Sequence, residues 1–283
     1  MRKQARDDKP SFACFPYNTE VYILNKAILF FIIVCLLVLV LAGYKITSEL
    51  RTQKEEINDF NELAELITES TTTQEQTEPS TEPKNNDIPT DTEPTPIIST
   101  RNLAPVFERN EDCIGWVYIE GTAVDYPVMH TPNEPQRYLR KNFDKEYSTA
   151  GVPFLKGICT LECDNLILYG HNMKNGTMFS DVTQYRNKDY YTAHPVIEFE
   201  TAQGLKRYAV FAVAQIKNND GWYAFHLAAD ESEYDSKIAE IKSRSLYVTE
   251  ITPMYGQQLI TLSTCYGATK SDRIIVIGVE IHE

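Results

Sequence analysis

The chain has 283 residues, with 40 acidic residues against 27 Lys and Arg, a formal net charge of −13 at pH 7 and six cysteines. This acidic balance, without a basic patch that carries interleaved aromatic side chains, excludes nucleic acid as an expected partner. Six cysteines in a chain of this length are too few for a disulfide scaffold.

An uncharged apolar stretch, AILFFIIVCLLVLVLAGY, spans residues 27–44 and follows a leader of residues 1–26. Eighteen residues are close to the minimum with which a helix crosses a hydrocarbon core of about 30 Å. A cleaved signal peptide is the main alternative, because Val40-Leu41-Ala42 resembles a small-residue cleavage site. The leader is long for a signal peptide, so we predict a single-pass membrane anchor preceded by a cytoplasmic leader.

The charged segment that follows, residues 45–68, carries a thin apolar stripe. Ile57, Phe60, Leu63 and Leu66 recur at every third position, which predicts a juxtamembrane helix. We interpret this helix as a spacer, because a partner-binding coiled coil needs more turns than the segment provides.

Residues 69–100 have almost nothing to bury. They contain nine Thr, five Pro, seven acidic residues and one Lys, which predicts a disordered, extended tether. Counted only near the membrane, Lys and Arg differ little between the two sides of the apolar span, so positive charge alone does not orient it. The Thr- and Pro-rich stalk favours an N-terminus in the cytoplasm and a C-terminal domain outside the cell.

Residues 101–283 are the only segment able to build a core, and their 183 residues are ample for one domain. Short apolar and alternating runs predict several strands, and a Gly-containing turn at residues 202–205 predicts a hairpin between two of them. A β-barrel or sandwich with helical insertions is therefore the expected fold. The candidate strands are WVYIEGTAVDYPV (residues 116–128, with a turn at its centre), NLILYG (165–170), VIEFET (196–201), KRYAVFAVAQ (206–215), QLITLSTC (258–265) and RIIVIGVEI (273–281).

One amphipathic helix is expected within this domain. Tyr234, Ile238 and Ile241 fall at positions i, i+4 and i+7, which predicts a helix over residues 232–245.

The domain contains four of the cysteines, and the other two, Cys14 and Cys35, precede or lie within the apolar span. Cys159 and Cys163 could form a disulfide outside the cell or, with further ligands, hold a metal. No histidine or second cysteine pair stands near them in the sequence, so two ordinary thiols are the expected state.

The stretch TLSTCYGATKSDR contains a candidate nucleophile, Cys265. If the last two strands form a hairpin around Thr269, Cys265 and Arg273 are symmetric about the turn and face each other across the ladder. The Arg guanidinium could then stabilise a carbonyl oxygen that the Cys sulfur attacks. The alternative is a buried, inert thiol beside a surface arginine.

A histidine should complete such a site, and His171 is the strongest candidate. It follows the predicted buried strand NLILYG, and strand ends hold side chains firmly while exposing them to a surface groove. The remaining histidines are His130, His194, His226 and His282.

Together these residues resemble a sortase, specifically a class B sortase. The resemblance rests on TLSTC followed eight residues later by Arg and on YGHNMKNGTMF, and it continues through CIGWVYIEGTAVDYPV, YLRKNF and AGVPFL. It covers nearly all of residues 101–283. The polymerising pilin sortases usually add a C-terminal anchor and a lid with an aromatic plug, and neither is found in this sequence.

The resemblance implies a mostly β fold, an eight-stranded sortase-type barrel with an extra helix between its sixth and seventh strands. It implies that Cys265 is the nucleophile, His171 the acid and base, and Arg273 the oxyanion or substrate clamp. Ser263 and Tyr266 are the expected substrate-binding residues. Some class B members carry an acidic residue directly after the nucleophile, and Tyr266 stands there in this chain.

The implied activity is that of a cysteine transpeptidase on the outer face of a Gram-positive membrane. It would cleave a sorting signal after Thr and transfer the protein to an amine of a peptidoglycan precursor, with no metal or cofactor. The alternatives are a pilin-linking transpeptidase, a hydrolytic cysteine protease and an inactive tethered binding module. Sorting motifs of this class are of the Asn-Pro-Gln-Thr or the Pro-x-Thr-Gly type, and the resemblance leaves both open.

Overall fold

The computed structural model describes residues 19–69 and 101–281. Most of the predicted leader, the predicted tether from residue 70 onward and His282 lie outside the described residues. The chain divides into two compact units, residues 1–54 and residues 55–283.

Helix α1 (Thr19–Glu69) contains the apolar stretch that the sequence marks as a membrane anchor. Its segment Ile23–Ile67 is long and apolar enough to cross a membrane, by length and composition. The side chains of residues 28–34 and 36–41 are exposed although all of them are large and apolar. Exposed apolar side chains of this kind are unfavourable in water and suited to a hydrocarbon core, which makes this segment a candidate membrane anchor.

The last turns of α1 belong to the second unit and contribute to its core. Phe60, Leu63 and Ile67 are buried, and the Phe60 ring meets the Tyr126 ring edge-on at 5.2 Å between centroids. The buried positions follow the 3.6-residue period, i, i+3 and i+7, so Ile67 rather than Leu66 is fully buried. This end of the predicted spacer helix is therefore part of the folded domain.

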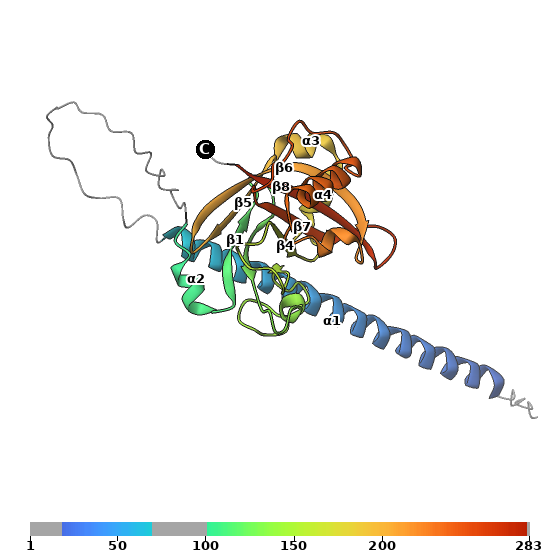
Figure 1. Cartoon of the computed structure of the whole chain (residues 1–283). Helices are drawn as coiled ribbons and strands as arrows, with labels where there is room; N and C mark the ends of the chain where they lie inside the picture. The colour runs from blue at the N-terminus through green and yellow to red at the C-terminus, as the bar shows by residue number, and fades with distance from the viewer. Residues whose placement is uncertain (1–18, 70–100, 282–283) are drawn as a thin grey trace, which may run out of the picture. The chain divides into compact units, whose positions relative to one another are not determined.

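Eight strands close into a barrel in the order β1-β2-β3-β4-β7-β8-β6-β5 (Figure 1). The expected eight-stranded barrel is confirmed, as is the hairpin that joins β5 to β6. The strands are β1 (Cys113–Tyr118), β2 (Asp125–Met129), β3 (Phe154–Leu155), β4 (Asn165–Tyr169), β5 (Val196–Thr201), β6 (Gly204–Lys217), β7 (Leu259–Cys265) and β8 (Asp272–Ile281).

Strands β4, β6, β7 and β8 are buried on both faces, which explains their nearly continuous apolar sequence. Along β8, Ile274 and Val276 join the larger core cluster, whereas Ile275 and Ile277 join a second cluster on the opposite face. Alternation of side chains along a strand produces this division.

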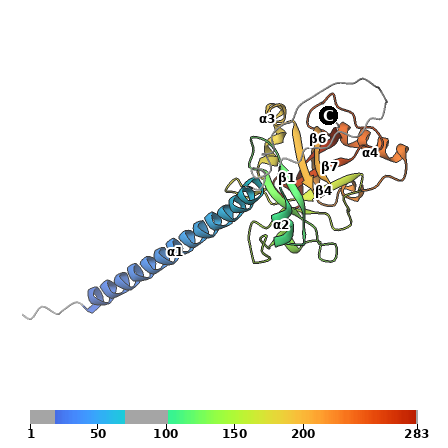
Figure 2. The same cartoon turned by 90° about the vertical axis from the view of Figure 1, so that its left-hand side faces the viewer.

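The second cluster lies under α4 (Glu231–Ser243), which connects β6 to β7 on the outside of the barrel (Figures 1 and 2). Tyr234, Ile238 and Ile241 are all buried there, so the predicted amphipathic helix and its position between the sixth and seventh strands are confirmed. Asp230 caps the helix by accepting a hydrogen bond from the backbone N–H of Glu233.

One short helix precedes β1, and others occupy connections between the strands. They are α2 (Ala104–Arg109), η2 (Arg137–Leu139), η3 (Asp181–Arg186), α3 (Lys188–Ala193) and η4 (Gly221–Ala224).

We predict that Leu63→Ala lowers the free energy of unfolding of the second unit by about 2–4 kcal/mol, because it opens a cavity in the core. Urea unfolding of the full chain in detergent micelles, followed by tryptophan fluorescence, measures this, since both tryptophans, Trp116 and Trp222, are buried in that unit. Ile57→Ala is the matched control on the same helix, because Ile57 is 37% exposed. Equal effects of the two substitutions would contradict the packing of α1 against the barrel.

Candidate active site

The candidate site lies where β7 ends between β4 and β8. Strands β4 and β7 are parallel and pair Tyr169 with Ser263, so His171 and Cys265, each two residues further on, emerge at the same barrel edge. Strand β8 is antiparallel to β7 and pairs Arg273 directly with Cys265. The predicted hairpin symmetry is confirmed, and the two registers bring the three predicted residues together.

Cys265 is exposed, in contrast to the other domain cysteines that the structure describes. Burial raises the pKa of Cys113 to about 12 and that of Cys159 to about 11, so these thiols stay protonated. Cys163 is buried as well. Because a thiolate is the nucleophile and must reach its substrate, Cys265 is the thiol suited to covalent chemistry.

His171 is held by a backbone carbonyl. Its Nε2 lies 3.0 Å from the carbonyl oxygen of Leu139, which can only accept a hydrogen bond. The proton therefore sits on Nε2 in both charge states, and Nδ1 is the nitrogen that gains or loses a proton. Burial lowers the pKa of His171, with Arg140 adding to the decrease and the Leu139 hydrogen bond opposing it.

Arg273 is fixed on the β7–β8 turn through one nitrogen of its guanidinium. Nη1 donates to the carbonyl oxygens of Lys270 and Asp272, each at 2.8 Å. Within the described part of the chain, Nε and Nη2 have no hydrogen-bond partner. These groups supply three N–H donors that a substrate oxygen can use.

The turn that carries Arg273 is itself braced. The Asp272 carboxylate accepts from the Lys217 ammonium and, at 2.7 Å, from the backbone N–H of Thr269. The Lys217 hydrogen bond is the largest cause of the decrease in the pKa of Asp272 to about 2. Gly267 has φ +111°, and a Cβ there would lie 2.7 Å from the Asp272 side chain, so the turn requires glycine.

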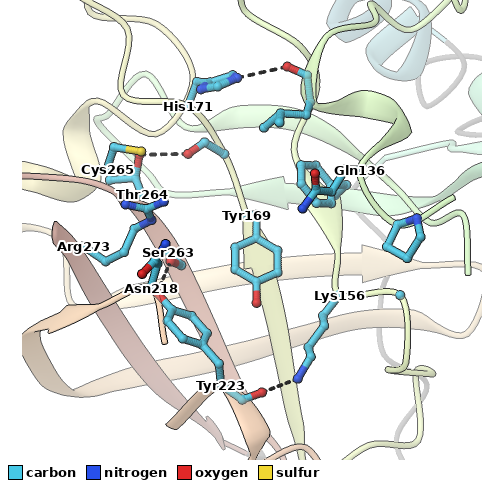
Figure 3. A pocket seen from close by; sticks show the side chains of 15 residues that line it. Gln136, Lys156, Tyr169, His171, Asn218, Tyr223, Ser263, Thr264, Cys265 and Arg273 are labelled. Atoms are coloured by element: carbon cyan, nitrogen blue, oxygen red, sulfur yellow. Dashed lines mark hydrogen bonds between the residues drawn. The ribbon is translucent and has the colours of Figure 1, made fainter. Parts of the chain in front are cut away.

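A cavity of about 400 Å³ adjoins these residues. Figure 3 shows His171, Cys265 and Arg273 toward one end of it and Lys156 and Tyr223 toward the other. The lining residues are Pro135, Gln136, Leu139, Phe154, Lys156, Gly157, Tyr169, Gly170, His171, Asn218, Tyr223, Ser263, Thr264, Cys265 and Arg273.

Aromatic rings form one wall of the cavity. Tyr169 lies between Phe154 and Tyr223, with centroid distances of 5.5 and 5.8 Å. Ser263, predicted to bind substrate, lines the cavity, and its buried hydroxyl shares a hydrogen bond of 2.7 Å with the Tyr223 hydroxyl. Its substrate role remains a prediction.

Tyr266, the other predicted substrate-binding residue, is not among the side chains that line this cavity. Its hydroxyl accepts a 2.9 Å hydrogen bond from Arg186, whose guanidinium lies 5.7 Å from the centre of the tyrosine ring. A substrate role for Tyr266 also remains a prediction.

The other described histidines do not line the cavity. Each has a ring nitrogen near a backbone oxygen: His130 near Gly157 at 3.4 Å, His194 near Glu120 at 2.8 Å and His226 near Ala224 at 2.9 Å.

Cys159 and Cys163 are two free, buried thiols in the structure. Among the described residues, no group of three or more His, Cys, Asp or Glu side chains is arranged to hold a metal ion.

Sequence reasoning did not find several residues of the site. Leu139 stands within YLRKNF and Lys156 directly follows AGVPFL, but neither was singled out, and Tyr223 lies in η4, distant in sequence from the motifs. Asn172 also contributes, since its side chain donates to the Cys265 carbonyl at 3.0 Å, and it was visible as the last residue of the YGHN motif.

Comparisons with known proteins agree with this architecture. A model of the sortase domain family matches residues 117–281. Sortase B of Listeria monocytogenes is 32% identical over 166 residues, which span 58% of this chain and 66% of that protein. Sortase B of Staphylococcus aureus is 28% identical over 185 residues, which span 62% of this chain and 75% of that protein.

Solved structures extend the similarity. A Staphylococcus aureus sortase B–substrate complex superposes with a TM-score of 0.59 at 27% identity, covering 62% of this chain and 83% of that one. Clostridium perfringens sortase B gives a TM-score of 0.60 at 27% identity, covering 64% of this chain and all of that one (100%).

We predict that the wild-type chain loses stability relative to His171→Gln as the pH falls. Burial places the pKa of folded His171 below the ordinary value of 6.5. As the pH falls, His171 is therefore protonated in the unfolded chain before it is protonated in the folded chain. The contribution of neutral His171 to stability is complete above pH 6.5 and is lost as the pH falls from 6.5 to the lower pKa of the folded state.

Thermal unfolding of both full-length proteins at pH 7.5 and pH 5.0 measures the effect. Gln keeps a donor for the Leu139 carbonyl, and His226→Gln, outside the cavity, controls for the removal of a histidine. A stability difference between wild type and His171→Gln that does not change with pH would refute this account of His171.

Proposed function

The chain belongs to the sortase family, class B, and on this premise we propose that it is a membrane-anchored cysteine transpeptidase that acts on sorting signals outside the cell. The observation that carries the proposal is the arrangement around β7. An exposed thiol, a carbonyl-oriented imidazole and an arginine with unused donors converge at one end of a cavity. In the proposed reaction, their roles are nucleophile, acid and base, and oxyanion donor.

In the first half-reaction, the Cys265 thiolate attacks the carbonyl carbon of Thr in the sorting signal. The carbonyl oxygen becomes an oxyanion, to which the unused Nε and Nη2 donors of Arg273 give hydrogen bonds. Protonated Nδ1 of His171 then gives its proton to the departing amine as the C–N bond breaks, leaving a thioacyl enzyme.

In the second half-reaction, an acceptor amine attacks the thioacyl carbon. Neutral His171 takes the proton from that amine at Nδ1, and the Cys265 thiolate leaves. The product is a new amide bond, so the substrate protein becomes covalently joined to the acceptor. We propose an amine of a peptidoglycan precursor as this acceptor; a similar structure of sortase B was solved in complex with triglycine.

The proposed localisation follows from the same chemistry. A single-pass α1 with its N-terminus in the cytoplasm would hold the barrel at the outer membrane surface, linked through the predicted tether of residues 69–100. Membrane-bound substrate and lipid-linked acceptor would then meet the enzyme at a raised effective concentration.

We predict that Cys265→Ala abolishes cleavage of sorting-signal peptides by the full chain in detergent micelles. Cys35→Ala, which removes an exposed thiol of α1, should keep the activity. Chromatographic detection of both peptide fragments is the measurement. Cleavage that persists in Cys265→Ala would exclude this thiol as the nucleophile.

We predict that Arg273→Ala lowers kcat/KM by about 10²–10³-fold, the usual effect of losing an oxyanion donor. Arg273→Lys should restore only part of the loss, because an ammonium lacks the planar set of donors. Initial rates at several peptide concentrations separate kcat from KM. An unchanged kcat in Arg273→Ala would contradict a role in the transition state.

Adding triglycine should divert the thioacyl enzyme from water to the amine and increase the yield of ligated peptide. A hydrolytic protease would give the same products with and without the amine. Stronger competition by a Lys-bearing pilin peptide than by triglycine would instead favour a pilin-linking transpeptidase. Mass spectrometry of the products distinguishes these outcomes.

A further inference from the structure

The candidate cavity is positively charged in a chain of formal charge −13. Lys156 and Arg273 are its Lys and Arg residues, and no Asp or Glu is among the residues that line it. The proposed reaction accounts for Arg273, which faces the oxyanion. The proposed reaction assigns no role to the positive charge of Lys156.

Lys156 is fixed at the end of β3. Its backbone N–H donates to the Ile167 carbonyl at 2.8 Å, and its ammonium donates to the Tyr223 carbonyl. One of the three ammonium donors is thus used on the protein, and two remain. Figure 3 shows the side chain running along the cavity toward Tyr223, away from His171.

No carboxylate among the described residues forms an ion pair with Lys156. Four other lysines of the domain do form such pairs, namely Lys145, Lys206, Lys217 and Lys237. A charged group that is half-buried without a counter-ion is poised to bind an anionic group, because the protein partly shields it from solvent screening.

The proposed function indicates which part of a substrate would reach Lys156. The scissile carbonyl must lie at Cys265, and the departing amine must lie near His171, which protonates it. Lys156 lies toward the opposite end of the cavity (Figure 3). The substrate segment there is therefore the acyl portion, the residues that precede the scissile Thr.

We infer that Lys156 is a specificity residue that selects sorting signals with an acidic side chain upstream of the scissile Thr. This inference rests on the proposed function. The carboxylate binds the two remaining ammonium donors, beside the wall formed by Tyr169 and Tyr223. The cavity contains no acid that would repel it, and Lys presents a compact charge suited to this contact.

Peptide binding to the full chain carrying Cys265→Ala tests the inference without turnover. Fluorescent Asn-Pro-Gln-Thr and Pro-x-Thr-Gly peptides carry Asp, Asn or Lys in turn at each position before Thr. At one of these positions, Asp should tighten binding about three- to tenfold over isosteric Asn, the range expected of a partly shielded charge pair. Salt should weaken this preference.

Lys156→Gln should reduce the Asp-to-Asn ratio to about one, and Lys156→Glu should favour the Lys-bearing peptide instead. Lys188→Gln, at an exposed lysine outside the cavity, is the matched control and should keep the ratio. An Asp-to-Asn ratio that Lys156→Gln does not change would overturn the inference. The inference would also be overturned if Lys156→Gln lowered the unfolding temperature and had no other effect, because Lys156 would then serve only to connect β3 to Tyr223.

Turnover by the wild-type full chain separates the two proposals. Cleavage that depends on Cys265 but shows no preference for Asp would overturn the role of Lys156 and leave the transpeptidase proposal standing. An absence of Cys265-dependent cleavage for every peptide would overturn both.

Discussion

The site depends on one constraint, the hydrogen-bonded register of β7 with its two neighbours. Parallel pairing with β4 puts the end of β7 beside the end of β4, and antiparallel pairing with β8 puts Cys265 opposite Arg273. A slip of one residue in either ladder would turn the β7 side chains to the other face. The closed barrel and the two apolar clusters on its faces oppose any such slip, because it would expose buried side chains.

Polar side chains on β7 reinforce this register. Thr261 donates to the Asn165 side chain at 2.8 Å and accepts from the Trp222 indole at 3.1 Å. Thr264 donates to the Gly170 carbonyl at 2.8 Å, directly before His171. A buried polar group without its partner costs about 1–3 kcal/mol, so these contacts disfavour alternative alignments. The same contacts connect β7, which carries Cys265, to β4, which carries the wall residue Tyr169, and to Trp222, the neighbour in sequence of the wall residue Tyr223.

The sequence predicted those parts of the fold that local patterns determine. The β7–β8 hairpin and the Cys265–Arg273 pairing follow from symmetry about a turn, and the buried face of α4 follows from helical spacing. The barrel end of α1 did not follow in the same way. Its stripe has the same pattern as a spacer helix, and the two are distinguished by contacts with the barrel, such as that of Phe60 with Tyr126.

The residues of the candidate site likewise fall into those that the sequence predicted and those that only the structure revealed. His171, Cys265 and Arg273 were predicted because their chemistry is carried by side chains within short motifs. The orienting group of His171 is a backbone carbonyl, that of Leu139, and a backbone carbonyl has no signature in the sequence. Lys156 is one lysine among many until the closure of the barrel places it in the cavity without a carboxylate beside it. Tyr266 follows the nucleophile in sequence, yet its side chain contacts Arg186 outside the cavity lining.

The central claim is that the register of β7 makes Cys265 the covalent nucleophile, and trapping the acyl enzyme tests it most directly. The full chain is incubated with a sorting-signal peptide in the absence of an amine, quenched in acid, weighed intact and digested to locate any adduct. The account predicts a mass increase equal to the acyl portion of the peptide, on the fragment that contains Cys265, and its removal by hydroxylamine. An adduct on another residue, or cleaved peptide with no adduct at Cys265 at any time point, would contradict it.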